Sequence, residues 1–119
     1  MIRKNGQYNT ELRPEMRGGT GTVKIEHLLD EAGELRGLNR LFARLTLEPG
    51  TSIGFHEHVG EAEVFVVISG TGEVDDNGVK SAVAAGDTIL TGFGAGHGVA
   101  CTGSEPLVML AVITKEAAK

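Results

Sequence analysis

The sequence predicts an all-β fold, built as a sandwich or barrel of short strands. Runs rich in Val, Ile and Leu recur at a spacing of about 8–12 residues, which is typical of such folds. Glycine accounts for 18 of the 119 residues, roughly twice its usual share of about 7%, and it lies between these runs, where tight turns favour it. No segment repeats apolar residues with the helical period over a helix-sized length of about ten residues.

The first strands follow a polar arm. Residues 1–21 are polar and rich in glycine, and we expect them to form an arm or a loose first strand. Thr22–Leu29 has the two-residue alternation of a strand. Asn39–Leu47 alternates in the same way, and the pair Pro49-Gly50 ends it as a turn.

The later strands are marked by turns and apolar runs. Glu63–Ser69 is a strand with apolar residues on both faces, and the pair Asn77-Gly78 predicts a tight hairpin. The remaining predicted strands are Val79–Ala84, Thr88–Leu90, His97–Thr102 and Leu107–Thr114. We expect the tail Lys115–Lys119 to form a frayed helical turn.

Length, charge and hydropathy narrow the class of protein. A chain of 119 residues suits one domain. The net charge of -5 argues against a nucleic-acid partner, which normally meets a basic stripe. The only basic cluster is Arg3, Lys4, Arg13 and Arg17, and acidic residues interrupt it.

Further features predict a cytoplasmic protein with no membrane partner. The longest apolar stretch, Leu107–Ile113, is far shorter than the roughly 20 residues of a membrane helix. The N-terminus has no apolar core of a signal peptide, and Cys101 is the single cysteine, so no disulfide forms within the chain.

Three histidines and one glutamate have the chemistry of a metal site. His56 and His58 are two residues apart, so in an extended strand their side chains point to the same face. Glu63 begins the next predicted strand, and His97 lies on a later one that a barrel can bring alongside. Imidazole and carboxylate ligands suit a divalent first-row metal. For the histidine pair alone, a polar loop before a strand is the alternative interpretation.

The spacing of these residues resembles the two motifs of the cupin superfamily. The first motif is a Gly, five residues, His-x-His, three or four residues, a Glu, six residues and a Gly. Its positions here are Gly50, His56, His58, Glu63 and Gly70. The second motif is a Gly, five residues, Pro-x-Gly, two residues, a His, three residues and an Asn. Here Gly86, Gly94 and His97 match, whereas Gly92 replaces the Pro and Cys101 replaces the Asn.

The resemblance implies a small single-domain bacterial cupin with a conserved barrel of the cupin-2 type. Its fold would be a double-stranded β-helix, or jelly-roll barrel, that we place at residues 22–119. One divalent transition metal (Mn, Fe, Ni, Zn or Cu) would sit inside one mouth of the barrel. Its ligands would be His56, His58, Glu63 and His97.

Three further residues are candidates for the pocket beside the metal. Cys101 follows His97 by four residues and faces the same side, either as a thiol near the metal or as a small buried hydrophobic residue. Arg44, like Arg40, either binds a carboxylate or phosphate of a substrate or lies on the solvated face. Phe65 either walls the cavity or packs in the core.

Two classes of function fit these residues. Four protein ligands leave open positions on a six-coordinate metal, which is typical of a catalytic site. The first hypothesis is therefore a metal-dependent enzyme, either a dioxygenase or an isomerase, decarboxylase or lyase, acting on a small, oxygen-rich and anionic molecule. The second is a cupin that binds or senses a small ligand without catalysis. Fold alone does not decide between them.

The predicted strands also indicate a homodimer. Glu63–Ser69 and Leu107–Ile113 are apolar on both faces, whereas a small barrel has one interior. The second apolar face needs a cover, either the arm of residues 1–21 or another subunit. The resemblance adds that cupins of this size commonly dimerise by packing sheets and exchanging N-terminal strands.

Overall fold

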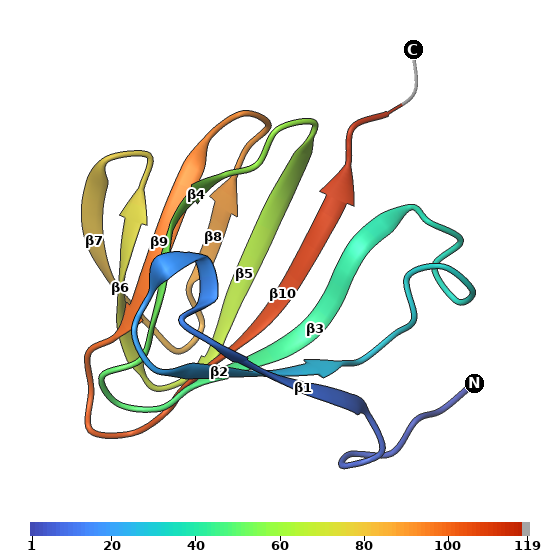
Figure 1. Cartoon of the computed structure of the whole chain (residues 1–119), viewed down its shortest axis with the longest axis horizontal. Coiled ribbons are helices and arrows are strands. Elements are labelled where there is room, and N and C mark those ends of the chain that lie inside the picture. The colour runs from blue at the N-terminus through green and yellow to red at the C-terminus, as the bar shows by residue number, and fades with distance from the viewer. Residues whose placement is uncertain (118–119) are drawn as a thin grey trace.

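The computed structural model describes residues 1–117, in which the regular secondary structure is antiparallel β-strand apart from one short 3₁₀ turn (Figure 1). The strands are β1 (Asn9–Pro14), β2 (Thr22–His27), β3 (Asn39–Leu47), β4 (Ser52–Glu57), β5 (Glu61–Ser69), β6 (Thr71–Asp76), β7 (Val79–Ala84), β8 (Thr88–Thr91), β9 (Gly96–Cys101) and β10 (Leu107–Lys115). A short 3₁₀ turn, η1 (Met16–Gly18), lies between β1 and β2.

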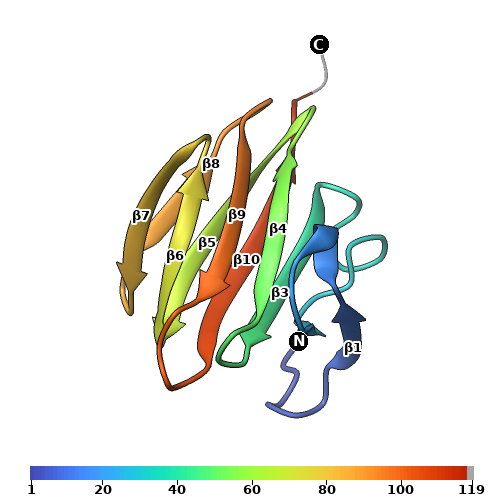
Figure 2. The same ribbon diagram turned by 60° about the vertical axis from the view of Figure 1, so that its left-hand side comes forward.

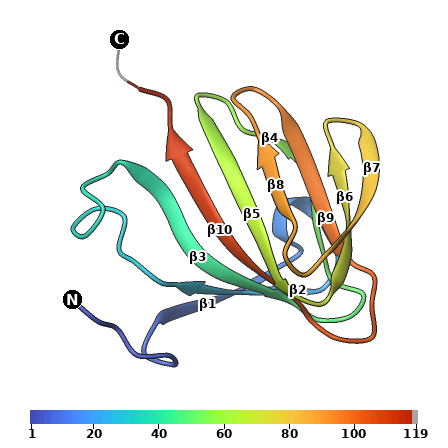
Figure 3. The ribbon, with the colours of Figure 1, turned by 180° about the vertical axis from the view of Figure 1, so that it is seen from behind.

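The strands form two sheets that face each other, as the rotated views in Figures 2 and 3 show. The larger sheet has the order β1-β2-β3-β10-β5-β8, and the smaller one the order β4-β9-β6-β7. Consecutive strands β4 and β5 belong to different sheets, and so do β8 and β9, so the chain winds repeatedly from one sheet to the other. This is the double-stranded β-helix, or jelly roll, that the sequence predicts.

Alternating side chains build the core between the sheets. In β10 the inward positions Leu107, Met109 and Ala111 are fully buried. Phe65 and Val67 of β5 pair with β10 and are buried on the same face. Both strands were predicted from runs that are apolar on both faces, and the structure buries one of these faces in the core.

The predicted turns and strand ends are largely confirmed. Strands β3 and β7 have the predicted bounds. Asn77 and Gly78 both have positive φ, at 50° and 98°, which the two-residue hairpin turn requires. The predicted helical tail is wrong at Lys115, which still belongs to β10, and the next two residues are not helical. Its end, residues 118–119, lies outside the described residues.

The polar arm of residues 1–21 contains a paired strand. β1 runs antiparallel to β2 and forms one edge of the larger sheet. η1 then packs against β4 of the other sheet. The arm therefore bridges the two sheets at one side of the barrel. No helix within residues 1–117 is long and apolar enough to cross a membrane.

Candidate metal centre

The four predicted ligands come together from both sheets. His56 on β4 lies opposite His97 on β9 in the smaller sheet, while Glu63 comes from β5 of the larger sheet. His58 follows the end of β4. Their ligand atoms all lie within 4.8 Å of one another. His58, Glu63 and His97 are buried, and His56 is half-buried at the pocket.

A bulge in β4 turns the first histidine inward. Ile53 pairs with Val99 and His56 pairs with His97, so β4 has one more residue than β9 across this interval. An extra residue reverses the alternation beyond it. Ile53 faces the core at 3% exposure, and without the bulge Phe55, not His56, would share its face. Gly54 lies within the bulge, where a missing side chain is an advantage.

The distances between the donor atoms fit a transition metal. His58 Nε2 lies 3.1 Å from His97 Nε2. The Oε1 atom of Glu63 lies 3.0 Å from His58 Nε2 and 2.9 Å from His97 Nε2. Ligands at about 2.1 Å from a metal lie about 3.0 Å apart when adjacent in an octahedron, and about 3.4 Å apart in a tetrahedron. The spacing of these three atoms therefore matches adjacent octahedral positions.

Each histidine is oriented by a partner at its other ring nitrogen. His56 Nδ1 lies 2.8 Å from the carbonyl oxygen of Gly54. His58 Nδ1 lies 2.5 Å from a carboxylate oxygen of Glu61, and His97 Nδ1 lies 2.6 Å from the hydroxyl of Thr91. An oxygen acceptor at Nδ1 keeps the proton there and leaves the lone pair of Nε2 for a metal. The protein thus supports all three imidazoles from behind.

An ion pair fixes the carboxylate behind His58. The guanidinium of Arg40 bonds both carboxylate oxygens of Glu61 at 2.7 Å. This contact, opposed by burial and helped by His58, lowers the pKa of Glu61 to about 2. Glu61 therefore remains a charged acceptor for His58 at any pH at which the imidazole is neutral.

Burial and hydrogen bonding shift the pKa values of the site in opposite directions. Burial is the main cause of the lowered pKa of His56, and the nearby histidines and Arg17 add to it. The hydrogen bond to Glu63 is the main cause of the raised pKa of His58. Burial raises the pKa of Glu63, but hydrogen bonds from the histidines outweigh burial and hold it below its ordinary value. Glu63 is therefore anionic at neutral pH, the form that could hold a metal ion.

A pocket of about 590 Å³ opens beside the four residues. It is lined by His56, His58 and Glu63 on one side. The other charged or titratable side chains that line the pocket are Arg3, Arg13, Arg17, His27, Asp30, Glu31 and Arg40. This volume is in the range of small-molecule sites, and its arginines outnumber its acidic residues.

These arm residues were not predicted at the pocket. Arg3, Arg13 and Arg17 form a basic cluster in the sequence, but only the docking of the arm brings them near the four clustered residues. His27 also lines the pocket, where its Nε2 lies 2.8 Å from a carboxylate oxygen of Glu11. No motif position marks His27, so the strand alternation of β2 was the only signal available.

The weaker pocket candidates lie in other places. Arg44 bonds Glu26 at 2.9 Å and lies over the ring of Tyr8, so it does not line the pocket. Cys101 is in the hydrophobic core, with its thiol 3.3 Å from the carbonyl oxygen of Glu105. Phe65 stacks on the His97 ring, with centroids 4.9 Å apart and planes inclined by 6°. Of these three candidates, Phe65 alone contacts one of the four predicted ligands, which we call the tetrad (His56, His58, Glu63 and His97).

The different placement of Arg40 and Arg44 follows from a second bulge. Ile113 of β10 pairs with Leu41, and the next residue pairs with Asn39, so Arg40 has no partner in this register. A bulge re-aims the side chain that it releases from the alternation. Arg40 thereby reaches Glu61 and the pocket, while Arg44 in the regular part of β3 faces away from the core.

A jelly-roll barrel with a tetrad of three histidines and a glutamate at its pocket defines the class of the protein, and comparison with known proteins agrees. Residues 43–113 match the family model described as a cupin domain. The chain belongs to the cupin family, as its two motifs suggest.

Three known proteins or structures resemble the chain along nearly its whole length. An oxalate-binding protein of Thermotoga maritima is 39% identical over 113 residues, which cover 95% of this chain and 93% of that protein. The crystal structure of a predicted oxalate decarboxylase from Thermotoga maritima superposes with a TM-score of 0.92 at 38% identity, covering 97% of this chain and 99% of that one. An RmlC-like cupin from Shewanella frigidimarina has a TM-score of 0.70 at 18% identity, covers 97% and 91% of the two chains, and shares the fold.

Proposed function

We propose that the chain binds one divalent transition metal through His56, His58, Glu63 and His97, and uses it to hold a small carboxylate such as oxalate. The observation that carries this proposal is the convergence of Nε2 and Oε1 atoms to 2.9–3.1 Å beside a pocket that four arginines help to line. The relative named as an oxalate-binding protein supports the choice of ligand.

Charge explains why such a site takes an anion. Three neutral imidazoles and one carboxylate around a divalent ion leave a local charge of about +1. A carboxylate neutralises this charge and supplies the oxygen donors that a metal with open positions accepts. Manganese, iron, nickel, zinc and copper all accept this ligand set, and each would supply Lewis acidity, with redox chemistry added by the redox-active ones.

Elemental analysis and calorimetry test this proposal together. The protein is purified without added metal, its metal content is measured, and oxalate is titrated into the metal-loaded and the chelator-treated protein. We expect about one metal per chain, and oxalate binding by the loaded form alone. Equal binding of oxalate by both forms would contradict a metal-dependent site.

We further propose that the site is catalytic, with non-catalytic ligand capture as the alternative. Support comes from the open metal positions that four protein ligands leave, and from the relative described as a predicted oxalate decarboxylase. Metal-loaded protein is incubated with oxalate, and formate and carbon dioxide are measured. Equal amounts of the two products support decarboxylation, since hydrogen oxalate contains the atoms of one formate and one carbon dioxide. Unchanged oxalate recovered from a saturated protein would instead favour the binding module.

We also propose a homodimer in which a second copy covers the outer face of the larger sheet. Leu90 and Val64 pair on this face, and Leu90 and Ile68 are 63% and 53% exposed. Light scattering should give twice the chain mass of 12.5 kDa, and Ile68→Glu should shift the protein toward the monomer. A single-chain mass for the unmodified protein at micromolar concentration would refute the dimer. A cytoplasmic location stays a prediction, supported by the unpaired Cys101.

A further inference from the structure

Three of the four arginines at the pocket already have carboxylate partners. Arg3 bonds Glu34 through two nitrogens at 2.7 and 3.0 Å. Arg40 is held by Glu61. Arg13, the third paired arginine, bonds both carboxylate oxygens of Glu11 at 3.0 Å. Their guanidinium groups are therefore largely neutralised within the protein.

Arg17 differs from these three. It lines the same pocket as His56 and His58, yet within residues 1–117 its side chain has no hydrogen bond or ion pair to another residue. A guanidinium offers a planar fork of donors that matches a carboxylate. Arg17 is thus a free anion-binding group beside the tetrad.

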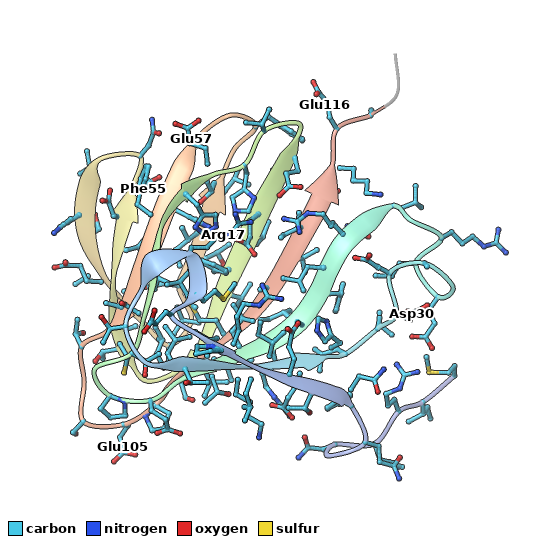
Figure 4. All side chains as sticks on the ribbon, viewed as in Figure 1. Arg17, Asp30, Phe55, Glu57, Glu105 and Glu116 are labelled. Atoms are coloured by element: carbon cyan, nitrogen blue, oxygen red, sulfur yellow. The ribbon has the colours of Figure 1, made fainter. Side chains whose placement is uncertain are left out.

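The backbone that carries Arg17 is fixed against β4. Figure 4 labels Arg17 on the η1 turn beside this strand. Ser52 and Thr20 exchange two hydrogen bonds of 2.9 Å, one from each backbone amide. A side chain at Gly19 would collide with the carbonyl oxygen of Ser52, and one at Gly54 with that of Arg17. The turn therefore approaches β4 as closely as two glycines allow.

Arg17 also holds a backbone conformation that a flexible arm would avoid. Its φ is 55°, in the left-handed region that costs a residue with a side chain about 1 kcal/mol or more. The docking of η1 on β4 maintains this conformation. The backbone position of Arg17 is consequently set before any ligand arrives, so that only the side chain has to be ordered on binding.

We propose that Arg17 determines specificity, by binding through its guanidinium the carboxylate oxygens of a dicarboxylate that are turned away from the metal. The inference rests on the proposed function, because it takes the other end of the ligand to be held at the tetrad. It assigns a selective role to the N-terminal arm, which lies outside the matched cupin domain of residues 43–113. Oxalate and malonate are the simplest ligands of this class.

Calorimetry on metal-loaded variants tests the proposal. Oxalate and malonate are compared with glycolate, which offers oxygen donors to the metal but has no second carboxylate. A charge-assisted hydrogen bond is worth enough to change affinity about tenfold to a hundredfold. We expect Arg17→Ala to lose this much affinity for both dicarboxylates and less than about threefold for glycolate, with unchanged metal content. Arg17→Lys should recover part of the loss.

Arg13→Ala is the matched control, since it removes the same charge from the same pocket but from a paired residue. An equal loss in this variant would overturn the specific role of Arg17 and indicate a general effect of charge. The proposal is also overturned if Arg17→Ala weakens dicarboxylates and glycolate alike, or weakens neither.

The fixed position of the turn has its own test. Gly19→Ala displaces η1 from Ser52, whereas Gly92→Ala adds a methyl group where no atom lies within 4 Å. We expect the first variant to lose dicarboxylate affinity as Arg17→Ala does, and the second to bind normally. Normal binding by Gly19→Ala would refute the pre-set position. If the unmodified protein takes up metal but binds no dicarboxylate, the proposed function and this inference fail together, whereas normal binding by Arg17→Ala removes this inference alone.

Discussion

The hydroxyl of Thr91 offers a sensitive test of the metal centre, because it contacts a ligand without being one. Its oxygen lies 2.6 Å from Nδ1 of His97, and both side chains are 1% exposed. Thr91→Val keeps the shape of the side chain and removes the acceptor. The Nδ1–H group that His97 presents when Nε2 binds a metal would then be buried without a partner.

The expected loss follows from this burial. A buried donor without an acceptor costs about 1–3 kcal/mol, and each 1.4 kcal/mol is about a factor of ten in affinity. Removing the partner behind a metal-bound histidine typically weakens metal binding by about 10–100-fold. We therefore expect the metal affinity of Thr91→Val to fall by about 5–100-fold, while Thr91→Ser, which keeps the hydroxyl, binds nearly normally.

A competition assay with a coloured chelator measures this loss. Thr88→Val is the matched control, because Thr88 lies on the same strand but is exposed. It should bind metal as the unmodified protein does, since exposed substitutions of this kind have small effects. The reasoning would be refuted if the metal affinity of Thr91→Val were within about twofold of that of the unmodified protein. It would also be refuted if Thr88→Val lost as much metal affinity as Thr91→Val.

Three further predictions concern the ligands and the core. His58→Ala should lose most of its bound metal by elemental analysis and keep the β-rich circular dichroism spectrum, because the substitution leaves core side chains such as Leu45, Leu107 and Met109 in place. Full metal occupancy would show the assignment to be wrong. Metal affinity should fall as the pH is lowered, because protons compete for imidazole nitrogen. The raised pKa of His58 and the lowered pKa of His56 mean that, of the two, His58 is protonated first as the pH falls. Metal retained equally at pH 5 and pH 8 after dialysis would contradict the competition between protons and metal. Leu45→Ala should cost about 2–5 kcal/mol in the free energy of unfolding, since Leu45 is 1% exposed, and denaturant titration showing a loss under 1 kcal/mol would contradict its place in the core.

The sequence alone was enough to predict the barrel and its tetrad. Strand alternation is a local property, because one face of each strand must be buried, and it marked β2 and β3. Apolar runs between turns, also a local property, marked β5 and β10. The spacing of His56, His58 and Glu63 is also local, since the three residues lie within one strand and the start of the next. His97 required the family resemblance, because only the pairing of β4 with β9 brings it opposite His56.

Other features were decided by tertiary structure. Two bulges, at Gly54 in β4 and at Arg40 in β3, change which face a side chain occupies, and alternation read from sequence assumes that no bulge is present. For this reason the same two alternatives, substrate binding or a place on the solvated face, were predicted for Arg40 and Arg44, although only Arg40 reaches the pocket. Arg17 lies 39 positions before His56 in the chain. Its place at the site depends on the close approach of η1 to β4, a contact between distant backbone segments that no local pattern encodes.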